Sequence, residues 1–207
     1  MEINPQELDS SHRYKLLIGT VVPRPIAFVS SISPEGKTNL APFSYFNAVG
    51  HNPLALAFSV APKSGGGEKD TLRNVRSVSQ GGTGEYVINL AVEPYARQVA
   101  EASEPLAYGE SEFDHIELTT APSRRVKAPR VAESPVAFEC RTLQIVPVGG
   151  FNLVIGEVIH WFIRDELVDE GYRVDTKSLA PIGRMAGNDY CYTDRQFTIP
   201  NGLPKSD

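Results

Sequence analysis

The sequence is poor in cysteine and has no long hydrophobic run. It contains two cysteines in 207 residues, Cys140 and Cys191, and neither belongs to a CxxC pair. This excludes a disulfide framework and makes both thiols small packing residues. No window approaches the roughly 20 apolar residues of a membrane-spanning helix, and residues 1–15 are polar and acidic, unlike a signal peptide. We therefore expect a cytoplasmic protein with free thiols and no membrane partner.

The sequence also has no excess of positive charge. Lys and Arg number 20 against 25 Asp and Glu, which gives a net charge of -5. Because the basic residues are scattered, whereas a nucleic-acid binder usually carries a basic stripe, we expect no nucleic-acid partner. The four histidines lack the spacing of metal ligands, so no metal site is predicted.

Three common functional motifs are missing. No GxGxxG segment follows a strand, which argues against a dinucleotide-binding fold. The stretch GGGEKDT at residues 65–71 is not a phosphate-binding P-loop, because Glu68 and Asp70 interrupt the required Gly-Lys-Ser/Thr order. A GxSxG nucleophile elbow is absent as well, so no motif supports hydrolase chemistry.

Residues 23–60 are the most informative stretch of the chain. Turn-forming residues at 34–36 and 50–53 divide it into three apolar runs, which predicts a three-stranded antiparallel meander. Pro42 lies in the middle run and has no N–H to donate, so it predicts a strand edge, a bulge or a departure from the sheet. Arg24 stands between two prolines and is therefore held extended, which makes it either a rigidly directed cation or a salt-bridge partner.

The third run alternates large and small side chains. One face carries Leu54, Leu56, Phe58 and Val60, and the other carries Ala55, Ala57 and Ser59. Since strand residues alternate between faces, we expect the large side chains in the core. The small ones would allow another body to approach closely.

Helices are predicted in three places. Residues 10–18 form one or two turns that end at Gly19, and Glu93-Pro94 begins a later helix that buries Tyr95, Val99 and Ala102. Between them, Asp70 is expected as an N-cap, with Leu72, Val75 and Val78 as the apolar stripe. The glycines at 65–67 in front of it are consistent with an anion site or with a flexible loop.

Strand patterns return at 86–90, 136–146 and 153–163, whereas residues 103–134 are expected to be loops around the core. Residues 179–190 show no periodicity and predict a loop that meets a surface. The total is six or more strands with short turns and a few short helices. We therefore expect a mostly β, antiparallel fold. A closed or partly closed barrel would leave the fewest unpaired strand edges at this size.

Six segments of the chain form a recognisable set in a fixed order. They are PRPIAFVSS at 23–31, GKTNLAPFSYF at 36–46, NP at 52–53, KDTLRN at 69–74, LVIGEV at 153–158 and PIGRMAGNDY at 181–190. Together they resemble the flavin reductase-like family with an FMN-binding split barrel. The resemblance covers about residues 15–195 of a single domain that spans 1–207. It implies a six-stranded split β-barrel, a homodimer with FMN near its interface, and electrons drawn from NADH or NADPH.

The resemblance also implies which residues bind the cofactor. Those of the isoalloxazine segment are Asn39, Leu40, Ala41, Pro42, Ser44 and Tyr45, with Asn39 and Tyr45 as ring contacts. Those of the phosphate and ribityl region are Ser59, Lys69, Asp70 and Thr71, and Arg24 and Arg184 are further cations. Some relatives have a histidine where this chain reads Gly150-Phe151-Asn152, and Asn152 could only hydrogen-bond there. No catalytic residue is therefore assigned.

Elementary chemistry agrees with these placements, because a phosphate needs N–H donors and cations and a reduced ring needs a nearby positive group. Tyr45 and Phe46 could instead be aromatic residues of a dimer core, and Tyr190 could pack at an interface. The leading hypothesis is an NAD(P)H-dependent flavin reductase that supplies a monooxygenase or another acceptor. The alternatives are an FMN-binding electron carrier without its own reductase activity and a barrel that has lost its cofactor.

Overall fold

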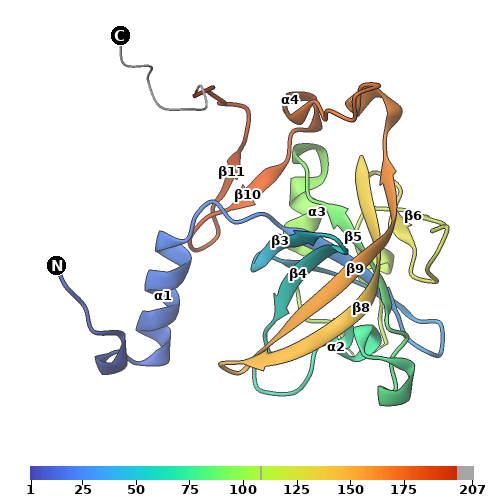
Figure 1. Cartoon of the computed structure of the whole chain (residues 1–207). Coiled ribbons are helices and arrows are strands. Elements are labelled where there is room, and N and C mark those ends of the chain that lie inside the picture. Colours follow the sequence, from blue (N-terminus) through green and yellow to red (C-terminus); the bar gives the residue numbers. More distant parts are fainter. Residues whose placement is uncertain (108, 200–207) are drawn as a thin grey trace, which may run out of the picture.

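The computed structural model describes residues 1–107 and 109–199, and one antiparallel sheet forms its centre (Figure 1). The sheet has seven strands in the order β2-β1-β5-β8-β9-β4-β3. Their bounds are β1 Ala27–Ile32, β2 Thr38–Phe43, β3 Phe46–His51, β4 Leu54–Val60, β5 Glu85–Leu90, β8 Val136–Val148 and β9 Phe151–Ile163. The outermost strands, β2 and β3, are not paired with each other, so the sheet is open on that side.

Smaller elements surround the sheet. Two hairpins add β6 (Thr120–Ala121) with β7 (Arg130–Val131), and β10 (Ile182–Arg184) with β11 (Tyr190–Tyr192). The α-helices are α1 Ser10–Thr20, α2 Asp70–Val75, α3 Ala96–Glu101 and α4 Thr176–Leu179. The 3-10 turns are η1 Pro5–Glu7, η2 Val78–Gln80, η3 Glu93–Tyr95, η4 Glu112–Asp114 and η5 Asp165–Leu167. None of the helices within the described ranges is long and apolar enough to cross a bilayer.

The predicted meander is wrong, because the run around Pro42 is two strands rather than one. The chain turns at Ser44 and Tyr45, so β2 pairs with β1 while β3 pairs with β4 at the opposite edge of the sheet. This division also explains why the sheet has seven strands, where the family resemblance implied a six-stranded barrel. The prediction that Pro42 lies at an edge is confirmed, since β2 has a partner on one side only.

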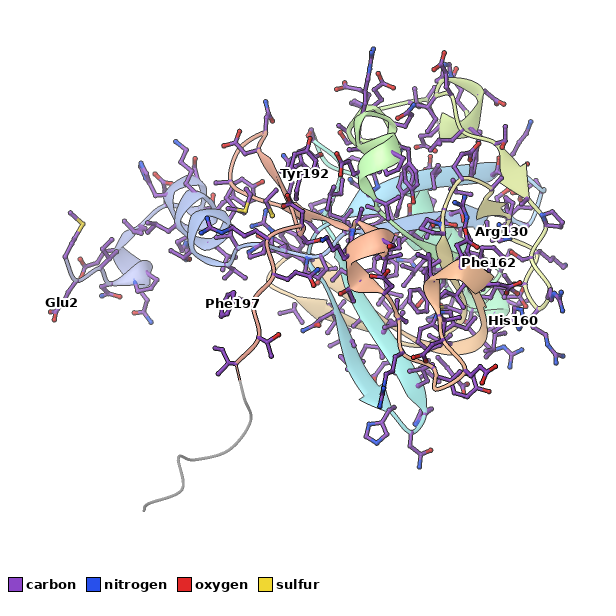
Figure 2. The ribbon with its side chains drawn as sticks, turned by 90° about the horizontal axis from the view of Figure 1, so that it is seen from above. Glu2, Arg130, His160, Phe162, Tyr192 and Phe197 are labelled. Carbon is purple, nitrogen blue, oxygen red and sulfur yellow. The ribbon has the colours of Figure 1, made fainter. Side chains whose placement is uncertain are left out.

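The sheet curls around a core in which both long strands take part. Phe58, Tyr86 and Val154 are buried in its main cluster, and a second cluster forms where Val99 of α3 packs near Phe28. Ala55 and Ala57, expected to face a second body, are already buried in the single chain. On another part of the surface, Arg130 lies over the ring of Phe162 at 3.9 Å (Figure 2).

Helix α1 stands apart from the sheet, beside the β10–β11 hairpin (Figure 1). None of its residues is buried. It continues through Gly19 to Thr20, two residues beyond the predicted end, because an exposed glycine is tolerated inside a helix at a modest cost. Residues 179–190, expected to be a loop, contain all of β10 and the first residue of β11.

Helix α2 begins one residue earlier than predicted. Its N-cap is Lys69, which makes no side-chain capping bond, and Asp70 is the first helical residue. The Asp70 carboxylate instead contacts Lys63 Nζ at 3.3 Å. Gly65, Gly66 and Gly67 all have positive φ, a conformation that glycine adopts without strain, and they turn the chain so that Lys63 comes back beside the helix.

Candidate functional site

Two adjoining cavities follow the open edge of β2. We call the first the tyrosine cavity; it measures about 200 Å³, and its polar and aromatic lining includes Tyr14, Arg24, Ser44, Tyr45, Ser103, Arg184 and Tyr190. We call the second the lysine cavity; it measures about 210 Å³, and its lining includes Asn39, Ala41, Lys63, Lys69, Asp70, Thr71, Glu104 and Glu112. Pro42 and Ser103 line both, so the two cavities form one groove.

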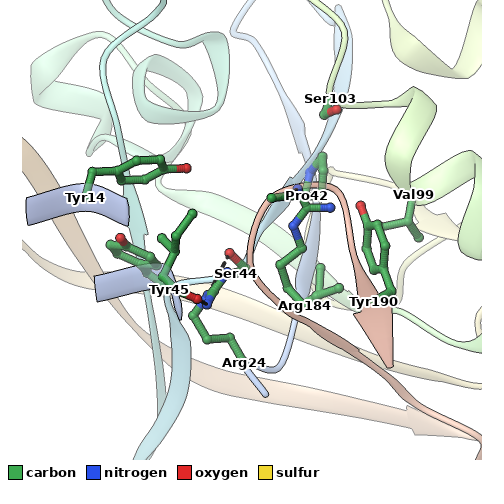
Figure 3. A pocket seen from close by; sticks show the side chains of 12 residues that line it. Tyr14, Arg24, Pro42, Ser44, Tyr45, Val99, Ser103, Arg184 and Tyr190 are labelled. Atoms are coloured by element: carbon green, nitrogen blue, oxygen red, sulfur yellow. Dashed lines mark hydrogen bonds between the residues drawn. The ribbon is translucent and has the colours of Figure 1, made fainter. Parts of the chain in front are cut away.

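Four separate parts of the chain build the tyrosine cavity (Figure 3). Figure 3 shows Tyr14 and Tyr45 on one side and Arg184 and Tyr190 on the other. The Arg184 guanidinium lies 4.5 Å from the centre of the Tyr190 ring and donates to the Gly187 carbonyl. Tyr45 stacks on Phe151 with ring centres 5.7 Å apart, and burial raises the pKa of its hydroxyl. The cavity thus has aromatic walls and a cation.

Arg24 lies at the base of this cavity and is held by neutral acceptors. Its Nη1 donates to the carbonyls of Ile18 and Val21, both at 2.8 Å, and its Nη2 donates to the Met185 carbonyl at 2.9 Å. Its Nε points to Ser44 Oγ at 3.4 Å (Figure 3). Within the described residues no carboxylate lies at salt-bridge distance, so Arg24 is a buried cation that ties together α1, the β2–β3 turn and the C-terminal hairpin.

The lysine cavity combines two ammonium groups with a hydroxyl. Burial lowers the pKa of Lys69, and the nearby Lys63 lowers it further. Thr71 Oγ1 accepts a hydrogen bond from Asn39 Nδ2 at 2.9 Å. Because that bond uses Thr71 only as an acceptor, its own hydroxyl hydrogen can be donated to another group. An anion in this cavity would meet a desolvated cation and an O–H donor.

Glu112 is the buried carboxylate of the lysine cavity, and its Oε2 accepts the Leu40 backbone N–H at 2.7 Å. Leu40 lies on the edge strand, so this bond satisfies an N–H that has no neighbouring strand. Burial raises the pKa of the Glu112 carboxyl. This residue was missed in the sequence, because it lies in the stretch 103–134 that showed no pattern.

Ten of the thirteen predicted site residues line the groove, and three do not. The ten are Arg24, Asn39, Ala41, Pro42, Ser44, Tyr45, Lys69, Asp70, Thr71 and Arg184. Leu40 has its side chain in the core. Ser59 uses its N–H to bind the Tyr45 carbonyl at 2.8 Å, and Asn152 pairs with Val60 at the start of β9. Neither of these two lines the groove.

Six further lining residues carry polar or aromatic groups that the sequence did not suggest for the site. They are Tyr14, Lys63, Ser64, Ser103, Glu104 and Glu112. Tyr14 was recognised only as part of a helical stripe. The other five lie in segments without a periodic pattern, where local spacing says nothing about spatial neighbours.

The residues of the groove fit FMN by the chemistry of their donors. A flat ring suits the end with Tyr45, Tyr190 and Arg184, and a phosphate suits the end with Lys69 and Thr71. Three carboxylates line that end as well, those of Asp70, Glu104 and Glu112. The repulsion of an anion is reduced because Asp70 has Lys63 as its partner at 3.3 Å and because burial raises the pKa of the Glu112 carboxyl.

Comparison with solved structures supports the split-barrel fold. Nitrilotriacetate monooxygenase component B from Bacillus cereus is 35% identical, with a TM-score of 0.89 over 96% of this chain and 98% of that one. The 2-nitrobenzoate 2-nitroreductase of Pseudomonas fluorescens is 32% identical, with a TM-score of 0.86 over the whole of both chains. A flavin reductase with a split barrel domain from Shewanella frigidimarina shares the fold at 20% identity, with a TM-score of 0.79 over 98% of this chain and all of that one.

The family model gives the same assignment from the sequence. It is described as the flavin reductase like domain and matches residues 18–197, which include every strand of the main sheet and all of the groove's lining except Tyr14. This protein therefore belongs to the flavin reductase-like family.

Proposed function

We propose that this protein binds FMN in the groove along β2 and uses it as an NAD(P)H-dependent flavin reductase. The observation that carries this proposal is the shape of the groove, which joins an aromatic end with a cation to an end with two lysines and a threonine hydroxyl. A bound flavin would supply the two-electron chemistry, and the protein would bind, orient and tune it.

Each part of the groove has a distinct task in this proposal. Lys69 and Thr71 hold the phosphate by charge and by a donated hydrogen bond. Tyr45 and Tyr190 pack against the ring. Arg184 supplies positive charge near the ring, because its guanidinium is half-buried in the tyrosine cavity. Arg24 adds a fixed positive charge near the flavin. It does not bind the flavin through Nη1 or Nη2, because these groups donate to backbone carbonyls.

The visible spectrum of the purified protein tests the proposal directly. We expect a yellow protein whose flavin absorbance disappears under argon when NADH or NADPH is added, and the donor that acts faster identifies the preference. A colourless protein that does not quench the fluorescence of added FMN would contradict flavin binding and favour a barrel that has lost its cofactor.

An electron carrier without its own reductase activity is the second candidate. The observation that favours it is the lack of a histidine at residues 150–152, where Asn152 is part of a strand and lines neither cavity. This candidate predicts a yellow protein that neither nicotinamide reduces but that dithionite reduces fully.

The acceptor is proposed from two of the solved structures, each more than 30% identical to this chain. Likeness to a monooxygenase component B supports delivery of reduced flavin to an oxygenase. Likeness to a 2-nitrobenzoate 2-nitroreductase supports direct reduction of a nitroaromatic acid. Consumption of NAD(P)H in the presence of 2-nitrobenzoate, with and without free FMN, distinguishes these two acceptors.

We further propose that the protein is a homodimer. Leu16 and Leu17 on α1 are about half exposed in the single chain, and Figure 2 shows Tyr192 and Phe197 projecting from the C-terminal segment. Large apolar side chains that gather in an exposed patch are typical of an interface. A second copy would cover α1, whose outer side has no partner among the described residues.

A further inference from the structure

We propose that the loop between β6 and β7 is a docking surface for an acidic segment of a partner protein. This loop, which we call the basic loop, consists of residues 122–130 and ends in the first residue of β7. It carries four cations, Arg124, Arg125, Lys127 and Arg130, whereas no acidic residue lies between positions 117 and 133. None of its residues, all of which the structure describes, lines either cavity of the groove. The docking surface is therefore independent of flavin binding.

The backbone of the basic loop is held in place by a buried carboxylate. Glu139 is only 1% exposed, and its carboxylate oxygens accept the N–H groups of Arg124 at 2.8 Å and Arg125 at 2.5 Å. The side chains of Val126 and Ala128 are buried in a core cluster. A loop that is already ordered loses little conformational entropy on binding, and this favours association. The cations are thus presented on a fixed support.

The cationic side chains of the basic loop are accessible from outside. Arg124, Arg125 and Lys127 are exposed. Arg130 is half-buried, and its guanidinium lies 3.9 Å from the centre of the Phe162 ring (Figure 2). This contact positions the guanidinium and leaves its charge in place. The loop lies on the opposite side of the molecule from α1 (Figures 1 and 2).

No side-chain ion pair within the described residues neutralises these four cations. The carboxylates that bind the loop do so through its backbone, because Glu139 accepts two N–H groups and Glu85 accepts the N–H of Lys127 at 3.1 Å. The cations therefore outnumber the carboxylates around them, on a chain whose net charge is -5. Such a local concentration of positive charge attracts a negatively charged surface and speeds its association.

An acidic protein segment suits the basic loop better than a nucleic acid does. Three of the four cations are arginines, which bind carboxylates through two parallel hydrogen bonds and are enriched at protein interfaces. A nucleic acid needs a longer basic stripe to follow its backbone, and the acidic remainder of this chain would repel it. The partner should therefore present several Asp or Glu side chains close together.

Fluorescence anisotropy with a labelled polyglutamate peptide tests the docking surface in the full chain. We expect Arg124→Glu with Arg125→Glu to raise the Kd of the peptide about 30-fold, because each change replaces an attraction by a repulsion. Both side chains are exposed and only their backbone N–H groups bind Glu139, so this variant should fold normally. The matched control, Arg13→Glu with Arg195→Glu, changes exposed residues on α1 and after β11. It should alter the Kd by no more than about twofold, since charges more than about 10 Å away are screened at about 0.1 M salt.

A change at Glu139 distinguishes docking on a fixed loop from general attraction between charges. Glu139→Gln removes a negative charge, so general attraction predicts tighter binding of the peptide. A fixed loop predicts a Kd about tenfold higher, because the amide has one acceptor oxygen where the carboxylate has two. If this variant does not fold, the arginine pair still tests the surface.

Three results would refute the docking surface: a wild-type protein that does not bind the peptide, equal losses in the arginine and control pairs, or tighter binding by Glu139→Gln. Single-stranded DNA and phosphatidylglycerol vesicles serve as competing probes in the same titration. If either binds the loop more tightly than the peptide does, the assignment to an acidic protein is overturned.

Discussion

At the scale of single residues, the groove depends on polar groups that are buried away from water and still able to bind a ligand. Lys69 is the clearest case, because burial lowers its pKa and so makes its charged form costly in the absence of a ligand. An anion that arrives beside it recovers part of that cost. Thr71 is also ready to bind an anion. Its hydroxyl oxygen accepts a hydrogen bond from Asn39, so its hydroxyl hydrogen can be donated to the ligand.

Removing both groups should therefore weaken FMN but not a flavin without phosphate. For Lys69→Ala with Thr71→Ala we expect the Kd of FMN to rise about 100-fold, since hydrogen bonds to charged groups are worth about 1.5–3 kcal/mol each. The affinity for riboflavin should stay within about threefold of its original value. His115→Ala, a change outside the groove, serves as the control in the same fluorescence titration, and equal losses for FMN and riboflavin would refute this placement of the phosphate.

In the core of the barrel, Gly156 lies directly against the side chain of Tyr86, and no larger residue fits at position 156. A Cβ at position 156 would lie 1.9 Å from the Tyr86 hydroxyl, and that hydroxyl has no hydrogen-bond partner among the described residues. We expect Gly156→Ala to lower the free energy of unfolding by about 3 kcal/mol through overpacking. Urea denaturation should show a smaller loss when Tyr86→Phe removes the clashing oxygen first, and no such rescue would mean that the strain lies elsewhere.

Glu112 predicts a pH dependence of stability. Since its folded-state pKa is raised above the ordinary value of 4.5, the folded protein binds more protons than the unfolded chain between those two values. Stability contributed by Glu112 is therefore present below pH 4.5 and is lost as pH rises through the folded pKa. Relative to Glu112→Gln, the wild-type free energy of unfolding should fall across that window, and parallel urea-denaturation profiles would contradict this.

At the scale of elements, Arg24 joins parts of the chain that do not otherwise form a common sheet. Its three shortest hydrogen bonds go to the end of α1 and to Met185 in the C-terminal hairpin. Backbone pairing reinforces this, because Arg24 and Arg184 form an isolated antiparallel bridge. One side chain and one bridge at position 24 thus connect the end of α1 to the C-terminal hairpin that closes the tyrosine cavity.

We expect Arg24→Met to loosen these elements together. Lost hydrogen bonds from a buried charged group should lower the free energy of unfolding by about 3 kcal/mol, and amide hydrogen exchange should accelerate at residues 18–21 and 184–190. Arg24→Lys should not restore protection, because an ammonium group cannot reproduce the planar fork of a guanidinium. Arg97→Lys, at an exposed ion pair on α3, is the control and should leave both measurements unchanged.

At the scale of the whole molecule, the exposed apolar side of α1 predicts the oligomeric state. Leu16 and Leu17 are 42% and 47% exposed in the single chain, so in a monomer the double change Leu16→Asp with Leu17→Asp would be nearly neutral. If a second copy covers α1, the same change should shift the protein from dimer to monomer in analytical ultracentrifugation. Arg13→Asp on the same helix serves as the matched charge control, and a wild-type monomer would refute the dimer.

Local chemistry in the sequence was sufficient for much of the fold. Alternating side chains placed Phe58 and Val60 in the core, and the glycines and prolines at 34–36 and 50–53 marked two hairpin turns, because these features depend only on neighbours along the chain. The family segments likewise identified ten residues that line one groove.

Only the tertiary structure decided which strands are neighbours and what completes the groove. The division of residues 38–51 between opposite edges of the sheet depends on long-range pairing of β2 with β1 and of β3 with β4, and no local pattern distinguishes this from a meander. Glu112 and Lys63 reach the groove through irregular segments, so their roles arise from packing alone. Arg24 became a structural tie because three carbonyls converge on it from distant parts of the chain.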